Sequence, residues 1–312
     1  MPELPEVETV REGLARHVLG TQITDLQVLR PASIRKQPGG ETEFSQRLLG
    51  RQITEVARRG KFMWLNLDNG QGLVAHLGMS GQLLVKSQPD PPAHRHLRIR
   101  IHLSPGQVGE VISPDAAGPL QADPPRVLDF VDQRVFGYLT VTDLIPTTDG
   151  APAGWGTTQS LLPPLVAHIA RDLLDDALDL DAVYTKLRAK RTGLKRVLLD
   201  QTVASGIGNI YADEALWLAQ VHPEQLTSSL SKPRFEKVFT AARQVMQDAL
   251  LAGGTSFDAL YVNVNGQSGY FSRSLRAYGR TDQPCERCGT PIRRIQSAGR
   301  STHYCPKCQT RR

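Results

Sequence analysis

The chain has 312 residues, of which 40% are hydrophobic and 22% charged, the composition of a globular protein with room for more than one domain. No stretch approaches the ~20 consecutive apolar residues that a membrane-spanning helix needs, so we expect no membrane partner. The formal net charge of +6 comes from one end: residues 276–312 carry nine Lys or Arg and two Asp or Glu, whereas the other residues sum to −1. A basic module of this kind favours a polyanionic partner, most simply nucleic acid.

Residues 6–19 form the first predicted element, a helix. Its apolar residues recur at spacings of three and four, as on a buried helical face: Val7, Val10, Leu14 and Val18. Pro5 suits the first helical turn, and the residues before it would lie at the positive end of the helix, which favours nearby anions. The first residues also lack the apolar core of a secretory signal, so we expect a cytoplasmic protein.

Residues 22–141 contain several short runs in which apolar and polar positions alternate between turns, a pattern typical of β-strands. The runs are ITDLQVL, KFMWLNL, GLVAHLGM, LRIRIHL and RVLDFVDQRVFGYLTV. Residues 104–125 interrupt them with five Pro, three Gly and no Lys or Arg, which predicts a loosely packed insertion between two strands.

The segment 145–164 is rich in Pro, Gly and Thr, as linkers are. A glycine-rich turn at 205–209 has backbone N–H groups that can bind phosphate, although an ordinary helix connection is the simpler interpretation. Residues 261–271 read as a polar loop rich in Asn and Gly. Helices are predicted between these features, near 166–176, 179–190, 192–201, 209–219 and 232–252.

All four cysteines lie in the basic C-terminal module, in the pattern C-x2-C-x16-C-x2-C. Each pair can place two thiolates on one ion, and the segment between the pairs can form a hairpin that brings them together. Two disulfides are the alternative, but nothing marks the chain as secreted. Cysteine fills every ligand position, which leaves none for a catalytic water. We therefore predict one structural Zn²⁺ per chain, bound by Cys285, Cys288, Cys305 and Cys308.

Six motifs occur in a fixed order along the chain: MPELPEVE at the start, RRGKF (58–62), HLGMSG (76–81), DQRVFG (132–137), GIGNIYADE (206–214) and the four-cysteine hairpin that ends in YCPKCQ. Through them the chain resembles the formamidopyrimidine-DNA glycosylase family over nearly its full length. The resemblance implies an α+β, multidomain fold. An N-terminal β-sandwich with flanking helices would be followed by a helix-two-turn-helix domain and a C-terminal zinc-finger hairpin, with DNA in the cleft between the domains.

On this resemblance we predict five segments: a catalytic domain at 1–145, a linker at 146–164, a DNA-binding helix-two-turn-helix domain at 165–260, a lesion-capping loop at 261–275 and a zinc finger at 276–312. The implied activity is that of a glycosylase and abasic-site lyase that excises 8-oxoguanine and formamidopyrimidines from double-stranded DNA and then carries out β,δ-elimination. We expect a monomer that is cytoplasmic and associated with the nucleoid.

The expected nucleophile is the N-terminal amine. Removal of Met1 would free the α-amine of Pro2, whose pKa of ~8, against ~10.4 for lysine, leaves more of it unprotonated at neutral pH. After attack on the deoxyribose C1′ and ring opening, this secondary amine gives an iminium with no N–H to lose. The iminium therefore stays cationic and promotes β-elimination of the 3′ phosphate. The alternative is that Pro2 only sets the first turn of the chain.

Four further residues are implied around this amine by the resemblance. Glu3 matches the general acid/base at the sugar ring oxygen, and Glu6 supports the lesion pocket. Lys61 matches the lysine that assists β-elimination, and Arg300 the zinc-hairpin arginine of phosphate binding and δ-elimination. Simpler interpretations exist: Glu3 as an acidic helix start, and Lys61 as a solvated strand-end lysine.

A base in duplex DNA is out of reach until it is extruded, and the gap must then be filled. Met79, Arg134 and Phe136 match the family's wedge, in which the arginine bonds the estranged cytosine. Core packing is the alternative for the two apolar residues. Val135 stands where the family often has a second arginine. The matched phosphate ligands are His76, His94, Lys190, Lys195 and Asn209.

Three other functions compete with this one. An enzyme of endonuclease VIII type, which favours oxidised pyrimidines, is disfavoured by the MPELPE start, by the wedge residues and by the long loop at 262–269. A non-catalytic DNA-binding protein on the same scaffold would be expected to lack Pro2, Glu3 or Lys61. A zinc hydrolase would need an open metal position, which a four-cysteine set does not offer.

Overall fold

The structure is a computed structural model that describes residues 2–89, 94–105, 126–253, 274–297 and 299–311. The predicted insertion at 104–125, beyond its first two residues, and the predicted loop at 261–271 lie outside the described residues. Among the helices that are described, none has the length and apolar character to cross a membrane.

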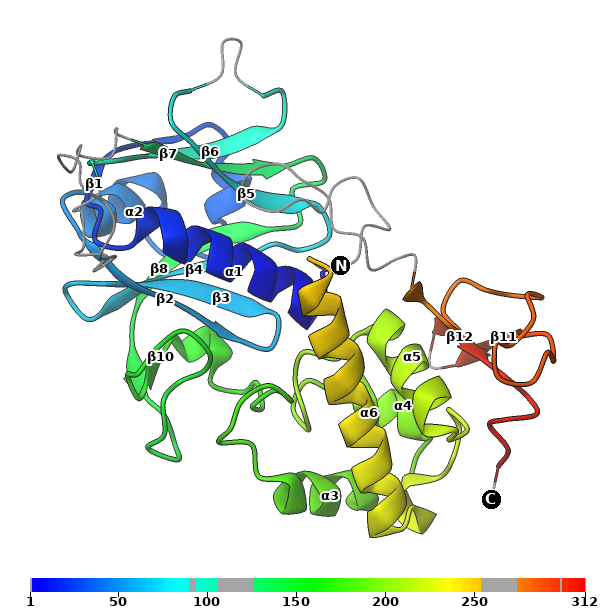
Figure 1. Cartoon of the computed structure of the whole chain (residues 1–312). Coiled ribbons are helices and arrows are strands. Elements are labelled where there is room, and N and C mark those ends of the chain that lie inside the picture. Colours follow the sequence, from blue (N-terminus) through cyan, green and yellow to red (C-terminus); the bar gives the residue numbers. More distant parts are fainter. Residues whose placement is uncertain (1, 90–93, 106–125, 254–273, 298, 312) are drawn as a thin grey trace, which may run out of the picture.

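Two antiparallel four-stranded sheets make up the N-terminal half (Figure 1), and their strands confirm the β-rich character predicted from the alternating pattern. The first sheet has the order β1 (Ile23–Val28), β6 (Leu97–Leu103), β7 (Arg126–Asp132), β5 (Gly81–Lys86). The second has the order β2 (Ile53–Arg59), β3 (Phe62–Leu67), β4 (Gln71–His76), β8 (Tyr138–Asp143). Side chains from both sheets share one buried core, so the two sheets form a sandwich.

Helix α1 (Leu4–Val18) closes one side of this core with the apolar residues predicted from its periodicity. It begins two residues earlier than predicted, with Pro5 in its first turn. Between β1 and β2 lie a 3-10 turn, η1 (Pro31–Ile34), and helix α2 (Gly40–Leu48), neither of which was predicted. Helix α2 buries only Phe44 and Leu48, too few apolar residues to give a helical period.

Residues 145–162 lie against the second sheet. They contain a small sheet of β9 (Ile145–Pro146) and β10 (Leu161–Leu162), and Trp155 forms a backbone bridge with Arg58 of β2. Ala153 is fully buried in a cluster with Trp64 and Val74. This segment is therefore part of the packed structure, and it fixes the sandwich to the helical half of the chain.

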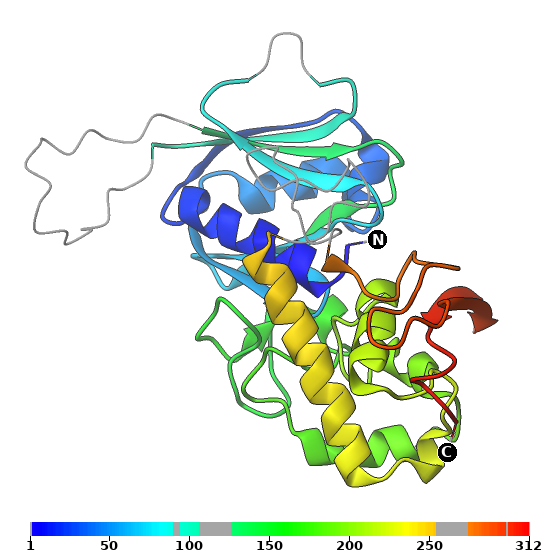
Figure 2. The ribbon, with the colours of Figure 1, turned by 45° about the vertical axis from the view of Figure 1, so that its right-hand side comes forward.

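The helical half contains α3 (Leu180–Ala189), α4 (Leu194–Leu198), α5 (Asn209–Ala219) and α6 (Lys232–Leu251), with short 3-10 turns η2 (Pro164–Val166) and η3 (Thr227–Ser229). The helices predicted at 179–190, 209–219 and 232–252 are confirmed, and the one predicted at 192–201 is shorter. Helix α6 packs on both α5 and α1, so it joins the halves (Figures 1 and 2).

The helix predicted at 166–176 is wrong, because these residues form turns beyond η2. Their local backbone bonds are single turns, such as Ile169 N to Val166 O (2.9 Å), and other groups bond to a distant segment: Ala170 N donates to Gln201 O (3.0 Å), and Arg171 O accepts from Ser205 N (3.2 Å). The apolar spacing in this segment reflects packing against two clusters, Val166 and Ile169 beside the second sheet and Leu173 in the helical core, and not a helical period.

The C-terminal module is a hairpin of β11 (Arg293–Ser297) and β12 (Arg300–Tyr304), and β12 packs against α5. The N-terminus lies where the sandwich, the helical half and this hairpin approach one another (Figures 1 and 2). The fold thus brings the two ends of the sequence into one region.

Candidate active site at the N-terminus

The start of the chain docks on the positive end of helix α5. Glu3, which is 5% exposed, accepts hydrogen bonds from the backbone N–H groups of Ile210 (3.0 Å) and Tyr211 (3.3 Å). Leu4 N donates to Gly206 O (3.1 Å), which fixes the neighbouring backbone to the glycine-rich turn. The first turn of α5, directly after the glycine-rich turn, therefore binds a carboxylate of its own chain.

Gly208 leaves the space that the Glu3 side chain occupies. A Cβ atom built at Gly208 would lie 2.1 Å from Glu3 Cδ, far inside van der Waals contact. Gly208 is the N-cap of α5 and has an ordinary extended backbone, so the requirement for glycine here is one of space and not of conformation. Any larger residue must push the carboxylate out of its position.

We expect Gly208→Ala to lower the rate of base excision by about 100-fold, because misplacing a reacting group by about 1 Å has effects of this size. The matched control is Gly193→Ala, since Gly193 is the N-cap of α4 and a Cβ there meets its nearest neighbour at 3.4 Å, an ordinary contact. Single-turnover excision of 8-oxoguanine measures both variants. Equal rates for the two would contradict the assignment of this space to Glu3.

Glu6 fixes the backbone from which Pro2 and Glu3 project. Its Oε2 accepts from the backbone N–H of Glu3 (2.8 Å), and its Oε1 accepts from the Tyr211 hydroxyl (2.7 Å). Glu6 is 7% exposed, and Pro2 is also buried. Both carboxylates at the N-terminus are thus oriented by α5, and the position of Pro2 follows from theirs.

Lys61 enters the same region from the turn between β2 and β3. Its Nζ donates to Ile207 O (2.9 Å), next to the residues that bind Glu3. Burial lowers the pKa of Lys61, the charge of Glu3 opposes this, and Arg300 on the hairpin lowers it further. Burial likewise raises the pKa of Glu3 against the opposing charge of Lys61. Lys61 therefore lies within electrostatic reach of Glu3, Glu6 and Arg300.

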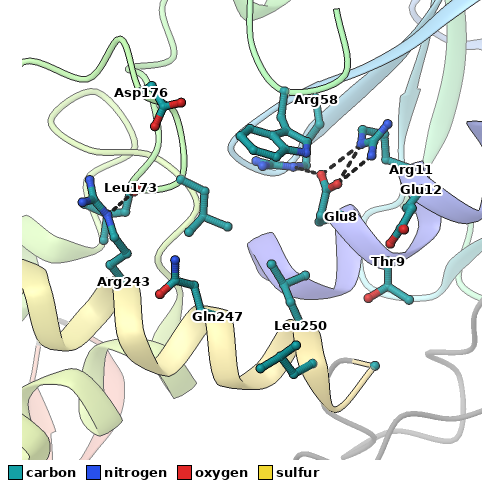
Figure 3. Close-up of a pocket in the computed structure, with 14 residues that line it drawn as sticks. Glu8, Thr9, Arg11, Glu12, Arg58, Leu173, Asp176, Arg243, Gln247 and Leu250 are labelled. Carbon is teal, nitrogen blue, oxygen red and sulfur yellow. Dashed lines mark hydrogen bonds and ion pairs between the residues drawn. The ribbon is translucent and has the colours of Figure 1, made fainter.

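Asp172 lies in the helical half of the chain, is 1% exposed, and binds the turn that carries Lys61. Its Oδ2 accepts from Gly60 N (2.9 Å) and from Arg58 Nη1 (2.7 Å). The fully buried Arg58 side chain also donates from Nε to Glu8 Oε2 on α1 (2.8 Å; Figure 3). The residue before Lys61 is thus tied to both halves of the molecule.

A cavity of about 650 Å³ opens beside this ion pair, between α1 and α6 (Figure 3). Glu8 and Arg58 form one wall, and Leu173 and Leu250 line the other side. Its lining contains none of the described residues predicted to be catalytic. The predicted catalytic residues therefore lie outside this cavity, where the first residues of α1 meet α5.

The four cysteines meet in the C-terminal module with their Sγ atoms all within 4.8 Å of one another, and none is in a disulfide. A tetrahedral zinc ion with Zn–S bonds of ~2.3 Å separates its sulfur ligands by about 3.8 Å, so the set fits such an ion. The Trp217 indole N–H of α5 points at Cys285 Sγ (3.4 Å), and Arg287 lies over the Trp217 ring, 4.0 Å from its centroid.

Two adjacent carboxylates on α5 hold the zinc module. Asp213, which is fully buried, accepts from the backbone N–H of His303 (2.8 Å) and pairs with Lys195 Nζ (2.6 Å). Glu214 accepts three backbone N–H groups, those of residues 276, 277 and 278, at 2.8 to 2.9 Å. Helix α5 thus connects the N-terminal carboxylates at its start to the zinc module further along.

Lys195 does not have the position predicted for a phosphate ligand. Its side chain is 2% exposed, and besides Asp213 it donates to Ser301 O (3.0 Å) and Thr302 Oγ1 (2.9 Å). Burial lowers its pKa and Asp213 raises it. Asn209 Nδ2 donates to the same Ser301 carbonyl (3.0 Å). In this structure both side chains fix the hairpin beside Arg300.

The predicted wedge residues lie on two adjoining loops of the sandwich. Met79 is half-buried in the turn before β5, whereas Arg134 and Phe136 are exposed between β7 and β8, Phe136 to 49%. A Cβ at Gly78 would come within 2.7 Å of Gly137 N, so the two loops pack backbone against backbone. Because Phe136 is exposed, it is not a core residue.

The other predicted phosphate ligands have different surroundings. His76 is half-buried and stacks on Tyr138 with 5.2 Å between ring centroids; burial and Arg35 lower its pKa. His94 is exposed. Lys190 is 44% exposed and pairs with Asp200 at 3.0 Å.

Sequence reasoning missed the residues that position the site. Asp213 and Glu214 lie inside the GIGNIYADE motif, so their place in that motif was the available signal. Asp172 is a single charged residue outside every motif that was singled out, and nothing in its local sequence marks it.

Models of three domain families match the chain. They are the formamidopyrimidine-DNA glycosylase N-terminal domain at residues 1–139, the formamidopyrimidine-DNA glycosylase H2TH domain at 169–259, and a zinc finger found in FPG and IleRS at 282–311. A curated relative, the formamidopyrimidine-DNA glycosylase of Thermobifida fusca (strain YX), is 51% identical over 311 residues, which cover 100% of this chain and 98% of the relative.

Solved structures of DNA complexes are similar along the whole chain. Lactococcus lactis Fpg in complex with DNA that contains an abasic site matches with a TM-score of 0.78 and 29% identity, covering 99% of this chain and 100% of that one. MutM in complex with DNA that contains carbocyclic 8-oxo-G matches with a TM-score of 0.77 and 29% identity, at the same coverage.

Proposed function

The chain belongs to the formamidopyrimidine-DNA glycosylase family, and on that premise we propose that its reaction runs through the secondary amine of Pro2, freed by removal of Met1. It is a DNA glycosylase of base excision repair that removes oxidised purines, and abasic-site lyase activity is typical of its family. Its four cysteines hold one structural zinc ion.

One observation carries the proposal: residue 2 lies beside two buried carboxylates that are oriented by the start of α5, with Lys61 bonded to the same turn. The amine attacks the deoxyribose C1′ and the base leaves with the electron pair of the C1′–N bond. Opening of the sugar ring gives an iminium cation that draws electrons from C2′, and loss of a C2′ proton expels the 3′ phosphate.

Each neighbouring side chain has a role in moving protons or charge. Glu3, whose pKa is raised by burial, holds a proton for the sugar ring oxygen as the ring opens. Lys61, whose pKa is lowered by burial, assists β-elimination and contacts phosphate. Arg300 binds phosphate and promotes δ-elimination, and Glu6 keeps the lesion pocket in place.

The partner is double-stranded DNA. We assign the wedge to Met79, Arg134 and Phe136, since Arg134 and Phe136 are exposed on one loop and Met79 lies on the loop that adjoins it. The phosphate ligands that we retain are His76, His94, Lys190 and Asn209, the last of which also bonds the zinc hairpin. Lys195 we assign to holding that hairpin. The basic module supplies attraction to the DNA backbone.

We propose that the chain acts as a monomer, because one chain already brings together the amine, the carboxylates, the lysine and the zinc module. The proposed domains at 1–145, 165–260 and 276–312 are supported by the three family matches, which fall within them. A location in the cytoplasm, at the nucleoid, follows from a DNA substrate and from thiolates that must stay reduced to hold zinc.

An enzyme that prefers oxidised pyrimidines is the nearest alternative. Release of 8-oxoguanine and of thymine glycol from matched duplexes separates the two functions. We expect faster release of 8-oxoguanine, and faster release of thymine glycol would overturn the assignment.

We expect Glu3→Gln to separate the two activities. Excision of 8-oxoguanine should fall by at least about 100-fold, the usual contribution of a positioned proton donor. Cleavage at a preformed abasic site should fall much less, because an abasic sugar already equilibrates with its open aldehyde and needs no proton from Glu3 at the ring oxygen. Quenched-flow assays on the two duplexes measure both rates. Equal losses on both duplexes would contradict the role of Glu3 as the proton donor to the sugar ring oxygen.

The stability of Glu3→Gln relative to wild type should depend on pH. The raised pKa of Glu3 means that the folded protein binds this proton more tightly than the unfolded chain does. That stabilisation is present at low pH and is lost as the pH rises through the folded-state pKa, and glutamine does not titrate. The difference in Tm, variant minus wild type, should therefore become more positive as the pH is raised above 4.5. Calorimetry that finds a constant or falling difference would contradict this.

A further inference from the structure

The loop between β7 and β8, residues 133–137, has an unusual backbone at its centre. Val135 has φ +56°, in the left-handed region, which a β-branched residue rarely adopts. This strained residue lies between Arg134 and Phe136, the two exposed residues of the proposed wedge. A conformation of this kind persists only where neighbouring groups hold it.

Arg35 supplies the largest set of those contacts. Its Nη2 donates to Phe136 O (2.7 Å), and its Nη1 donates to Gly137 O (2.7 Å) and lies 3.5 Å from Val135 O. The same Nη1 donates to Ala32 O (3.0 Å), which anchors the guanidinium to η1. One side chain therefore engages three consecutive carbonyls of the loop.

An aromatic ring also holds the guanidinium in place. It lies over the Tyr138 ring, 5.1 Å from the ring centroid, and Tyr138 in turn stacks on His76. Arginine suits this position because its planar group presents several donors in fixed directions, whereas a lysine presents one small ammonium.

Asp132 holds the opposite side of the loop. Its carboxylate accepts from Gly137 N (2.7 Å) and Arg134 N (3.2 Å), and it also bonds the Ser80 hydroxyl of the neighbouring loop. Arg35 donates to carbonyl groups of the loop and Asp132 accepts from its N–H groups, so both side chains bind the loop backbone. The Phe136 ring, 49% exposed, is left pointing outward.

We propose that Arg35 is a positioning residue that forms the wedge loop before DNA binds, so that Arg134 and Phe136 are already presented when a lesion is extruded. This rests on the wedge role proposed above. Without the clamp, Val135 would relax toward negative φ, and only a fraction of molecules would present Phe136. The apparent rate on a paired lesion then falls in proportion to that fraction.

The test is Arg35→Gln, which keeps a polar side chain, although a shorter one, and removes the guanidinium. We expect single-turnover excision of 8-oxoguanine paired with cytosine to slow by about tenfold, the effect of reducing the competent fraction to roughly a tenth. Cleavage at a preformed abasic site, which has no base to extrude, should change by less than about threefold. Arg35→Lys is measured as well, so that a variant with its positive charge retained is available if the glutamine variant does not fold.

A second substitution distinguishes positioning from general stability. Asparagine tolerates the left-handed region, so Val135→Asn in the Arg35→Gln background should restore at least half of the lost rate on a logarithmic scale. The matched control is Arg47→Gln: Arg47 also bonds β8, at Val141 O (3.2 Å) and Asp143 (2.6 Å), but away from the wedge loop. Arg47→Gln should leave the ratio of 8-oxoguanine excision to abasic-site cleavage unchanged.

Three results would overturn the proposal, each for a different reason. If Phe136→Ala excises the paired lesion at the wild-type rate, the wedge role fails and the proposal fails with it. If Phe136→Ala is slow while Arg35→Gln and Arg35→Lys match wild type, the wedge stands and the clamp is overturned. If Arg35→Gln and Arg47→Gln slow both substrates equally, or if Val135→Asn restores nothing, Arg35 has only a structural role and the proposal is overturned.

Discussion

Pro2→Gly should lower borohydride trapping on an abasic-site duplex by roughly 10³-fold, equivalent to about 4 kcal/mol of transition-state free energy. Glycine still offers an α-amine, but a primary one, whose imine loses its proton and its charge. Glycine also lacks the ring that is buried at the start of α1, so its amine is held less rigidly beside Glu3. Both effects slow the reaction after DNA has bound and leave the affinity for DNA unchanged.

The matched control is Pro5→Gly, the same substitution three residues along, in the first turn of α1. It should weaken the helix by no more than about 1 kcal/mol and leave trapping within a few-fold of wild type. Both variants should bind a duplex with a tetrahydrofuran site as tightly as wild type. Efficient trapping by Pro2→Gly would mean that another amine is the nucleophile.

Asp213→Asn should destabilise the protein by about 3 kcal/mol, because it leaves the Lys195 ammonium buried without its carboxylate. Lys195 and Asp213 are 2% and 0% exposed and 2.6 Å apart, and the same network bonds Ser301, next to Arg300. We therefore expect a lower Tm, faster loss of zinc to a chelator and weaker DNA binding together. Thermal melts, a chromogenic zinc assay and fluorescence anisotropy measure the three effects.

Asp200→Asn is the control, since Asp200 pairs with a lysine at similar distance, 3.0 Å, but at the surface, where such a pair contributes about 0–1 kcal/mol. Adding Lys195→Met to Asp213→Asn should recover part of the lost stability, because the stranded charge is then gone. If the double variant is less stable than the sum of the single effects, a stranded charge is not the cause.

The parts of the fold predicted from the sequence are those whose pattern lies in their own residues. Helix α1 and the strands of both sheets each turn one face to a shared core, and the spacing of apolar residues records this. Residues 166–176 show similar spacing, but their backbone bonds run to residues 201–205, and a local pattern carries no trace of such bonds. Helix α2 was missed because it buries only two residues.

The same limit applies to the site. Motifs pointed to Glu3, Lys61 and the cysteines, because their chemistry requires particular residue types at particular places in the chain. Lys195 was predicted as a phosphate ligand, because a lysine in a sequence does not reveal a buried partner such as Asp213. The positioning residues bind backbone groups that are distant in the sequence, so the structure is needed to identify them.

The most direct test of the nucleophile is to find the residue that carries the trapped sugar. Zinc-loaded protein purified from its own host is trapped on an abasic-site duplex with borohydride, digested, and analysed by tandem mass spectrometry. We predict that Met1 is absent and that the adduct lies on the nitrogen of Pro2. An adduct on Lys61 or another lysine, or full activity in protein that retains Met1, would contradict the mechanism.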